Sequence, residues 1–225
     1  MTSGEIETVL PHWAQANAEA EIAEIGPLSP SDLGGAKALY GEGSEALDEE
    51  AAKRRGRQLH LLLEHLPAWD QAEWDLHAHT LLAAGDNVAN AAEITELLAE
   101  ARRVLTNPDL AYIFAPDTLA EVEITAELPG YNRVMSGIID RLIVTPDAVT
   151  VVDFKSNRMV PDQAKDTPEG VLRQMAAYRA ALQQIYPNRP IHAEILWTYH
   201  AKLMPLEGAL LDSAYDRLDA GEVGS

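Results

Sequence analysis

Three residues that can hold a metal ion and assist hydrolysis stand on two neighbouring segments of the chain. Asp140 lies in the run 137–144, and Asp153 and Lys155 lie in the run 149–155. Both runs are rich in β-branched residues, which favours strands, and the Thr-Pro-Asp-Ala sequence between them indicates a turn. The two runs therefore predict a β-hairpin that carries all three side chains.

The register of the predicted hairpin decides whether the two acidic side chains meet. If Val144 faces Val149 and no bulge intervenes, Asp140 faces Asp153 with β-carbons about 5 Å apart. Lys155 follows Asp153 by two residues and so points to the same face of the sheet. Two carboxylates in this position repel each other unless a cation offsets their charge, and Mg²⁺ takes carboxylate oxygens as ligands. The pattern indicates a divalent-metal site, but a solvated pair with Lys155 as an ion-pair partner would explain the same residues.

The spacing of apolar residues predicts several helices around this hairpin. One helix runs from Asp48 to Leu66 and ends at Pro67, with leucines along one face. The other predicted elements are a short helix capped by Ser31, helices over 70–84 and 89–104, a short helix ending at Phe114, a strand over 120–128, a helix over 168–185 and a final strand over 191–199. This order of elements predicts an α/β domain with a mixed central sheet flanked by helices.

Composition excludes several kinds of site. The 225 residues include no cysteine, which excludes disulfides, zinc–thiolate sites, thiol nucleophiles and cysteine-held iron–sulfur clusters. No apolar run approaches the roughly 18 residues of a membrane-spanning helix, and the N-terminus lacks the basic and apolar regions of a signal peptide. We therefore expect a cytoplasmic protein with no membrane partner.

The net charge of −19 bears on the partners that the chain can bind. Residues 1–52 hold 11 acidic residues and one basic residue, Lys37. A protein that binds nucleic acid usually carries a basic face, so the charge argues against tight DNA binding by this chain alone. Divalent cations or a partner are expected to supply the positive charge. The chain is expected to divide into an acidic leader over 1–50, a folded domain over 51–212 and a tail over 213–225.

Several short motifs occur in a fixed order along the chain. They are Gly56-x-x-x-His60-x-x-x-Glu64, Gly137-x-x-Asp140-Arg141, Asp153-Phe154-Lys155-Ser156-x-Arg158 and Gln174-x-x-x-Tyr178. Together they resemble the motifs of PD-(D/E)XK nucleases, whose signature is D…(D/E)-x-K. The resemblance is greatest to the C-terminal nuclease domain of AddA, the helicase–nuclease subunit of bacterial AddAB recombination enzymes. Segments that also resemble AddA are Leu28-Ser29-Pro30-Ser31-x-Leu33, Ala120-Glu121-Val122 and Leu196-Trp197-Thr198.

The resemblance implies a restriction-endonuclease-like fold and a role for individual residues. His60, Glu121, Asp140 and Asp153 would ligate Mg²⁺ or Mn²⁺. Lys155 would orient or deprotonate the attacking water, or neutralise charge on the phosphate. Because imidazole suits Mn²⁺ better than Mg²⁺, the histidine favours Mn²⁺ as an alternative ion.

Further residues of these motifs have both a functional and a simpler interpretation. Gln174 and Tyr178 share a helix face and would position Lys155 or a DNA phosphate, or they belong to an ordinary amphipathic helix. The simpler interpretation of His60 is a helix histidine that packs beside its neighbouring leucines and binds no metal. Glu64 would support the site, and the arginines at 158, 173 and 179 would contact the DNA backbone. The simpler interpretation of all four is that they are solvated charges.

The resemblance implies a metal-dependent exonuclease that hydrolyses DNA strands unwound by an associated helicase during double-strand break repair and recombination. Its partners would be single-stranded DNA, the AddB subunit and the helicase portion of AddA, in a cytoplasmic, nucleoid-associated complex. The sequence contains no G-x-x-x-x-G-K-[ST] motif, so no ATPase motor of that type is expected in it.

Two alternatives to the enzyme stay open. The first is a catalytically silent nuclease fold that guides DNA or docks a partner subunit. The second is an interaction domain whose acidic leader docks on a basic surface. Such silent relatives typically lose an acid or the lysine, and here Asp140, Asp153, Lys155 and His60 are all present. The sequence therefore favours the enzyme.

Overall fold

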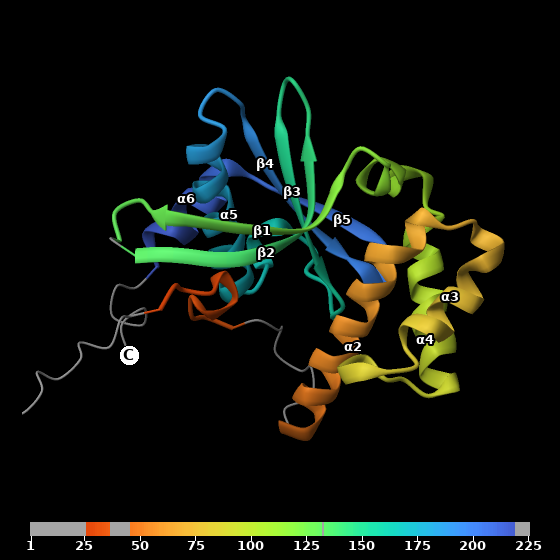
Figure 1. Cartoon of the computed structure of the whole chain (residues 1–225). Coiled ribbons are helices and arrows are strands. Elements are labelled where there is room, and N and C mark those ends of the chain that lie inside the picture. Colours follow the sequence, from red (N-terminus) through yellow and green to blue (C-terminus); the bar gives the residue numbers. More distant parts are fainter. Residues whose placement is uncertain (1–25, 37–45, 132, 219–225) are drawn as a thin grey trace, which may run out of the picture.

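The sheet at the centre of the molecule contains the predicted hairpin. The computed structural model describes residues 26–36, 46–131 and 133–218, and five strands among them form one sheet in the order β1-β2-β3-β4-β5 (Figure 1). The strands are β1 Leu119–Leu128, β2 Arg133–Val144, β3 Val149–Lys155, β4 Ile191–Trp197 and β5 Lys202–Leu206. Strands β3 and β4 are parallel and the other neighbours are antiparallel. The predicted mixed sheet is therefore confirmed.

Helices cover both faces of this sheet (Figure 1). One layer consists of α5 (Glu169–Ile185) and α6 (Gly208–Asp216), and the other consists of α2 (Ala46–His65), α3 (Trp74–Leu81) and α4 (Ala91–Leu105). Val151 of β3 belongs to the apolar cluster beneath α5, and Val152 belongs to the cluster beneath α2 and α4. Because successive side chains of a strand point to opposite faces, β3 is buried on both sides, as its continuous apolar run indicates.

Short 3₁₀ helices occur in the connections, and some of them replace parts of the helices predicted from the sequence. They are Pro30–Asp32, Leu66–Ala68, Gln71–Glu73, Gly85–Asn87, Pro108–Phe114, Ala164–Asp166 and Thr198–His200. The predicted end of the first long helix near Pro67 is confirmed, because α2 ends at His65. The helix predicted over 70–84 is shorter, because a 3₁₀ turn occupies its start and α3 ends at Leu81.

The segment around Pro30 differs from the prediction. Ser29, not Ser31, stands at the N-cap of the 3₁₀ helix, because proline with its fixed φ occupies the first helical position. Leu28 forms a parallel bridge with Met135 of β2, and Leu33 is buried in the core. This part of the predicted leader therefore packs on the sheet. Residues 1–25 and 37–45 of that leader lie outside the described residues.

The sequence prediction missed two elements at the C-terminal end. The strand predicted to be final ends at Trp197, and β5 and α6 follow it. Pro205 in β5 argues against a strand in the sequence, but proline is tolerated here because β5 lies at the edge of the sheet. Helix α6 continues across position 212, and Ala214 and Leu218 are buried. The packed part of the chain therefore extends into the predicted tail.

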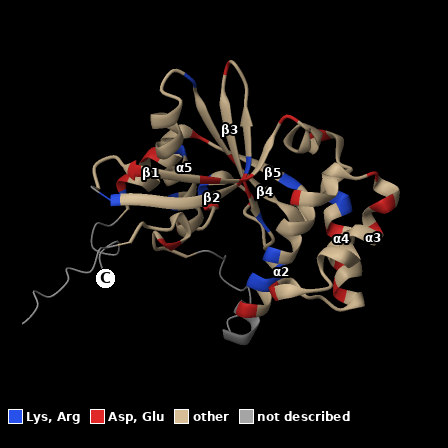
Figure 2. Cartoon of the chain, in the orientation of Figure 1, with Lys and Arg blue, Asp and Glu red and all other residues tan. Residues whose placement is uncertain are grey.

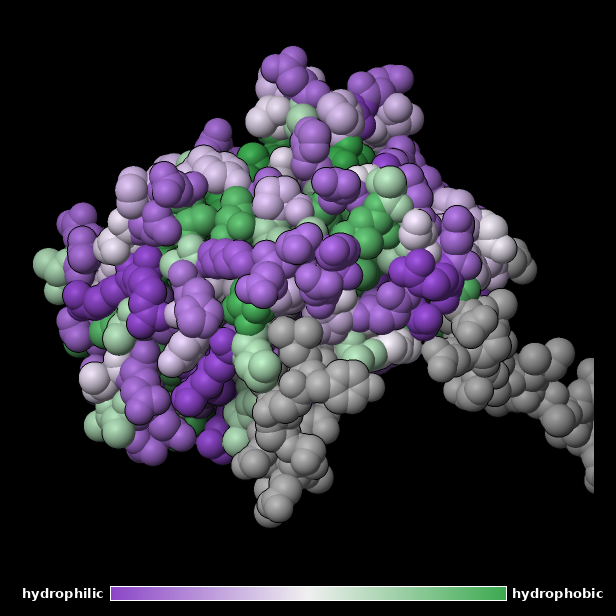
Figure 3. Space-filling model, turned by 180° about the vertical axis from the view of Figure 1, so that it is seen from behind, coloured by the Kyte–Doolittle hydropathy of each residue, from purple (hydrophilic) through white to green (hydrophobic). Residues whose placement is uncertain are grey.

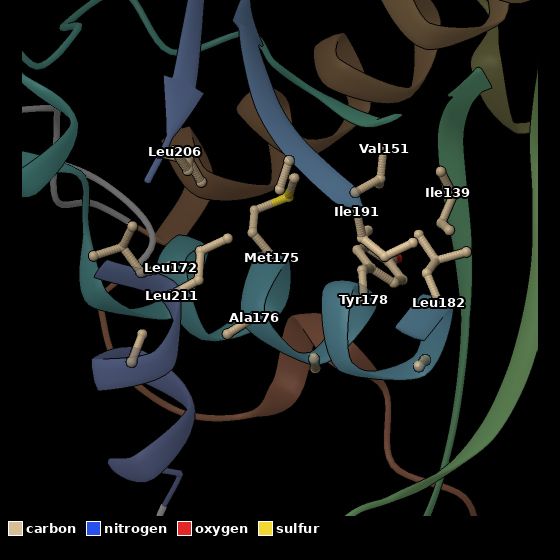
Figure 4. Packing of buried hydrophobic residues seen from close by; sticks show 14 of the residues in the cluster. Ile139, Val151, Leu172, Met175, Ala176, Tyr178, Leu182, Ile191, Leu206 and Leu211 are labelled. Atoms are coloured by element: carbon tan, nitrogen blue, oxygen red, sulfur yellow. The ribbon is translucent and has the colours of Figure 1, made fainter. Parts of the chain in front are cut away.

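Helix α5 joins the sheet to the C-terminal helix through a continuous apolar core. Figure 4 shows Tyr178 and Leu182 of α5 opposite Val151 and Ile139 of the sheet, with Met175 farther along the same helix. All five side chains are at most 3% exposed. This packing fixes the height of α5 above β2 and β3, the strands that carry the two aspartates.

A test of this packing is Gly137→Ala. A β-carbon at Gly137 would lie 2.7 Å from ring carbons of Pro30 and 3.2 Å from the Tyr178 hydroxyl. We expect the substitution to lower the free energy of unfolding by about 1–3 kcal/mol, measured by urea denaturation. Gly26→Ala, where nothing lies within 4 Å, is the control and should change stability little. Adding Pro30→Ala to Gly137→Ala should recover part of the lost free energy of unfolding. If the effects of the two substitutions simply add, the loss does not come from contact with Pro30.

Candidate metal centre

Three ligand-type side chains from three elements lie together near the C-terminal end of α2. His60 comes from α2, Glu121 from β1 and Asp140 from β2, and one ligand atom of each lies within 4.8 Å of the other two. The three residues are far apart in the sequence, so only the fold brings them together. Sequence reasoning had placed all three in one metal site.

The backbone of β1 is strained at Glu121. This residue has a φ of 47°, in the left-handed region that residues with a β-carbon rarely adopt. The β1–β2 ladder pairs Ala120 with Arg141 and Val122 with Ile139. Between these pairs, Glu121 and Asp140 stand opposite each other but are not paired. Strain of this kind costs about 1–3 kcal/mol and persists only where the surroundings enforce it. The strained position and the gap in the ladder coincide with the two acidic members of the group.

The hairpin of β2 and β3 has the predicted register. Four residue pairs obey it, and the ladder ends with Arg141 opposite Val152, one pair before the two aspartates. Asp140 then accepts a hydrogen bond at Oδ2 from the backbone N–H of Phe154, at 2.6 Å. Asp153 itself continues in the parallel ladder between β3 and β4. The two strands therefore stop pairing where the acidic side chains begin.

His60 and Asp140 form the tightest contact within the group, with Nδ1 and Oδ1 3.2 Å apart. Burial opposes a charge on the imidazole, but the neighbouring Asp140 outweighs it, and the pKa of His60 is raised. Burial likewise opposes ionisation of Asp140, but His60 and the Phe154 N–H hold the pKa of this carboxyl below its usual value. Burial and the charge of Asp140 raise the pKa of Glu121.

Asp153 lies in a second cluster, with Lys155 and Gln174. Its Oδ2 lies 2.7 Å from the Lys155 ammonium, and its Oδ1 accepts a hydrogen bond of 2.8 Å from the Gln174 amide. The Gln174 carbonyl oxygen in turn accepts a bond of 3.1 Å from Lys155. Burial raises the pKa of Asp153 in spite of Lys155, and the charge of Asp140 acts in the same direction as burial. Gln174 therefore contacts both Lys155 and Asp153, and its predicted role in positioning the lysine stays a prediction.

Tyr178 supports the strand rather than the lysine. Its hydroxyl donates a hydrogen bond to the carbonyl of Ile138, two residues before Asp140. Burial and the charge of Asp153 raise the pKa of this phenol, which keeps it a neutral donor. The predicted helix face of Gln174 and Tyr178 thus contacts β3 through one residue and β2 through the other.

Arg141 ties α2 to β2 beside the metal-binding group. Its guanidinium donates to the Leu63 carbonyl at 2.9 Å, and it lies 5.2 Å from the centre of the Phe114 ring. The side chain is 5% exposed, which is unusual for arginine. Sequence reasoning noted Arg141 only as a member of a motif. The buried guanidinium fixes the helix that supplies His60 against the strand that supplies Asp140.

A second buried network, which the sequence did not predict, reaches Lys155 from the other side. Glu100 of α4 is 3% exposed and pairs with Arg55 of α2 at 2.5 Å. Its other oxygen accepts a bond of 2.6 Å from the Thr198 hydroxyl, which also contacts the Lys155 carbonyl at 3.3 Å. The signal for Thr198 was its place in the Leu-Trp-Thr segment, but nothing in the sequence singled out Glu100.

Two of the three predicted DNA-contacting arginines have partners within the fold. Arg173 contacts Glu169 at 3.2 Å, and Arg179 contacts Asp212 at 2.6 Å. The guanidinium of Arg158 lies 5.5 Å from the centre of the Tyr199 ring. Of the three, Arg158 lies nearest in sequence to Lys155.

The donor set suits a divalent cation. One imidazole nitrogen and two carboxylates converge, and carboxylate oxygens suit Mg²⁺ and Mn²⁺ while imidazole favours the latter. The charge of Asp140 acts on Asp153, whose carboxylate contacts Lys155 and Gln174. A lysine side chain beside a buried acid and a metal-type donor set can serve the hydrolysis of a phosphate ester.

Comparisons with known proteins agree with this chemistry. A sequence profile of the PD-(D/E)XK nuclease superfamily matches residues 36–220, which include every residue of both clusters. A search of curated protein sequences gave no match.

Two solved structures are similar at low sequence identity. One is a candidate exonuclease from Eubacterium rectale, with 14% identity and a TM-score of 0.48; the alignment covers 79% of this chain and 65% of that one. The other is SSO0001, with 13% identity and a TM-score of 0.30, covering 78% of this chain and 86% of that one. The chain thus spans about two thirds of the length of the first.

Among the described residues, no helix is both long enough and apolar enough to cross a membrane. The face seen in Figure 3 carries hydrophilic side chains over most of its area, with smaller apolar areas between them.

The strain at Glu121 predicts a conflict between stability and metal binding. In EDTA, Glu121→Gly should raise the free energy of unfolding by about 1 kcal/mol, because glycine adopts a positive φ without a steric penalty. Glu123→Gly on the same strand is the matched control and should lower it by about 1 kcal/mol. Calorimetric titration with Mn²⁺ should show at least about tenfold weaker binding for Glu121→Gly alone. Equal destabilisation by both variants would show that the backbone at Glu121 is not strained. An unchanged Mn²⁺ affinity of Glu121→Gly would show that Glu121 is not a metal ligand.

Metal affinity should depend on pH through His60. The pKa of His60 is raised above its ordinary value of 6.5, and a metal binds only the neutral imidazole. The Mn²⁺ affinity should therefore fall as the pH falls through this raised pKa, by about tenfold per pH unit below it. Titrations between about pH 5 and 8 would measure this slope. His60→Gln should bind more weakly with a shallower slope; an unchanged slope would show that another group takes up the proton.

Proposed function

The chain belongs to the PD-(D/E)XK nuclease superfamily, and we propose that it is a metal-dependent deoxyribonuclease that hydrolyses phosphodiester bonds. Its mixed sheet flanked by helices confirms the predicted restriction-endonuclease-like fold. The observation that carries the proposal is the position of His60, Glu121 and Asp140 beside the cluster of Lys155 and Asp153. This arrangement supplies what a hydrolytic site would need: donors for a cation, and the partly exposed side chain of Lys155 beside them.

His60, Glu121 and Asp140 would hold the cation, and Asp153 would complete the set from β3. A divalent cation supplies Lewis-acid stabilisation of the phosphate charge and activates water. The raised pKa of Asp153 and Glu121 means that both acids gain from a neighbouring positive charge. Mg²⁺ and Mn²⁺ both suit the donors, and imidazole favours Mn²⁺.

Lys155 would act on the water or on the phosphate. Its ammonium is held by Asp153 at 2.7 Å and by Gln174 at 3.1 Å, so the side chain is oriented before a substrate binds. As an ammonium, this side chain can position the attacking water or stabilise negative charge that develops on the phosphate oxygens; as a neutral amine, it can accept a proton from the water. Gln174 and Tyr178 would support this geometry through Lys155 and through the backbone of β2, respectively.

The substrate we propose is single-stranded DNA released from duplex ends by a helicase, degraded as an exonuclease does during double-strand break repair. The support is the resemblance of several segments to the nuclease domain of AddA, which would make the AddB subunit and the helicase portion of AddA the partners. The net charge of −19 supports the need for a partner, since an acidic chain attracts DNA weakly.

The first test is cleavage of end-labelled single-stranded DNA with Mg²⁺ or Mn²⁺ and with EDTA. We expect metal-dependent cleavage that Asp153→Ala and Lys155→Ala each reduce by about 100- to 10,000-fold. Lys165→Ala, at an exposed position in the 3₁₀ helix Ala164–Asp166, is the charge-matched control and should cleave normally.

Two other outcomes separate the alternatives. Binding of DNA without cleavage under every metal condition, also with AddB and the helicase portion added, would indicate a catalytically silent guide. Cleavage that survives Lys155→Ala would place the chemistry outside the cluster described above.

A further inference from the structure

We propose that a cavity between α2, α4 and the segment after β3 binds a backbone phosphate of the DNA strand that is cut at the metal centre. This proposal rests on the nuclease function proposed above and assigns the path of its substrate. The cavity has a volume of about 260 Å³. Its charged and polar lining consists of Arg54, Arg55, Gln58, Glu93, Glu96 and Arg158.

The cavity lies at the most basic stretch of an otherwise acidic chain. Residues 53–57 read Lys-Arg-Arg-Gly-Arg, so they hold four of the 17 basic residues. Figure 2 shows this concentration of basic residues on α2. In a chain of net charge −19, such a local reversal of sign is a candidate for contact with phosphate.

The position of the cavity relative to the metal centre defines a path. Gln58 precedes His60 by two residues on α2, and Arg158 follows Lys155 by three. Arg54 precedes His60 by six residues, which is roughly 9 Å along a helix. A β-carbon at Gly56 would lie 3.4 Å from the Ser156 hydroxyl, so α2 runs directly beside the segment that leaves Lys155. A strand that leaves the metal centre along α2 and the segment after Lys155 would therefore meet the cavity.

The cations of the cavity differ in how firmly they are held. Arg55 is paired with the buried Glu100 at 2.5 Å, so its role is structural. Arg54 and Glu93 lie 3.5 Å apart and are both more than a third exposed, and such a loose pair contributes little and exchanges partners readily. Arg158 is paired with no carboxylate among the described residues and is oriented by the Tyr199 ring.

Glu93, one of the two acids in the lining, is engaged by groups outside the cavity. Glu93 also accepts a hydrogen bond of 2.8 Å from the Asn90 backbone in the capping box of α4, which draws its charge toward the helix N-terminus. Guanidinium groups match phosphate geometry with two parallel hydrogen bonds, so Arg54 and Arg158 suit a phosphate oxygen pair better than a single point charge. The contacts would be made to the backbone and would carry no base specificity.

The test compares Arg54→Ala/Arg158→Ala with a control double variant, Arg189→Ala/Arg217→Ala, which removes the same charge elsewhere. Binding of fluorescent oligothymidylate is measured by anisotropy in EDTA, so the metal centre takes no part. We expect about tenfold weaker binding for the cavity variant alone. Its dependence of log K on log salt should be shallower by about 0.7 for each phosphate that the variant no longer neutralises. Equal weakening by both double variants would overturn the proposal.

Kinetics with Mn²⁺ separate this proposal from the nuclease function. The ratio of kcat/KM for the oligonucleotide to that for bis(p-nitrophenyl) phosphate should fall about tenfold in the cavity variant, mainly through KM. An unchanged ratio would show that the arginines act only through the fold, and would overturn the proposal. If the unmodified chain cleaves neither substrate, also with AddB and the helicase portion added, the nuclease function fails, and the anisotropy measurement still decides whether the cavity binds the strand.

Discussion

Negative charge gathered in a largely buried place is the constraint on which the rest of this structure depends. Asp140 adds to the effect of burial in raising the pKa of both Glu121 and Asp153, so the three acids cannot all ionise without help. His60 contacts Asp140, and Lys155 contacts Asp153. This arrangement leaves an incomplete balance, because an imidazole and one ammonium face three carboxylates. A site that needs additional positive charge in order to be stable is a site that selects a divalent cation.

The fold uses buried polar contacts to keep this charged group in place. Arg141 joins β2 to the last turn of α2, and Glu100 joins α4 to Arg55 of the same helix. Thr198 then connects Glu100 to the backbone of Lys155. Removing one partner of such a buried pair leaves an uncompensated charge, which is costlier than the loss of an exposed pair. The distances within the site therefore depend on how the helices pack on the sheet and not on the hairpin alone.

The hairpin could be predicted because its information is local. A turn signal between two apolar runs determines which residues face each other, and the observed ladder follows that register up to Arg141. The positive φ of Glu121 has no local signal, because glutamate is a poor residue for it and only the tertiary contacts enforce it. The same holds for Glu100, a buried acid on a helix whose partners lie 45 and 98 residues away in sequence. Local patterns thus indicate which residues are candidates for the site, and long-range contacts determine the position and conformation of each one.

The acidity of the whole chain and the basic stretch of α2 act over different distances. At physiological ionic strength, charges separated by more than about 8 Å of solvent are largely screened, so the net charge of −19 governs encounter and the local cations govern contact. Free DNA would be attracted weakly and would meet the site rarely. A strand placed directly on α2 would meet Arg54 and Arg158 at contact distance. The basic stretch of α2 on an otherwise acidic chain is therefore consistent with the proposal that another protein delivers the strand.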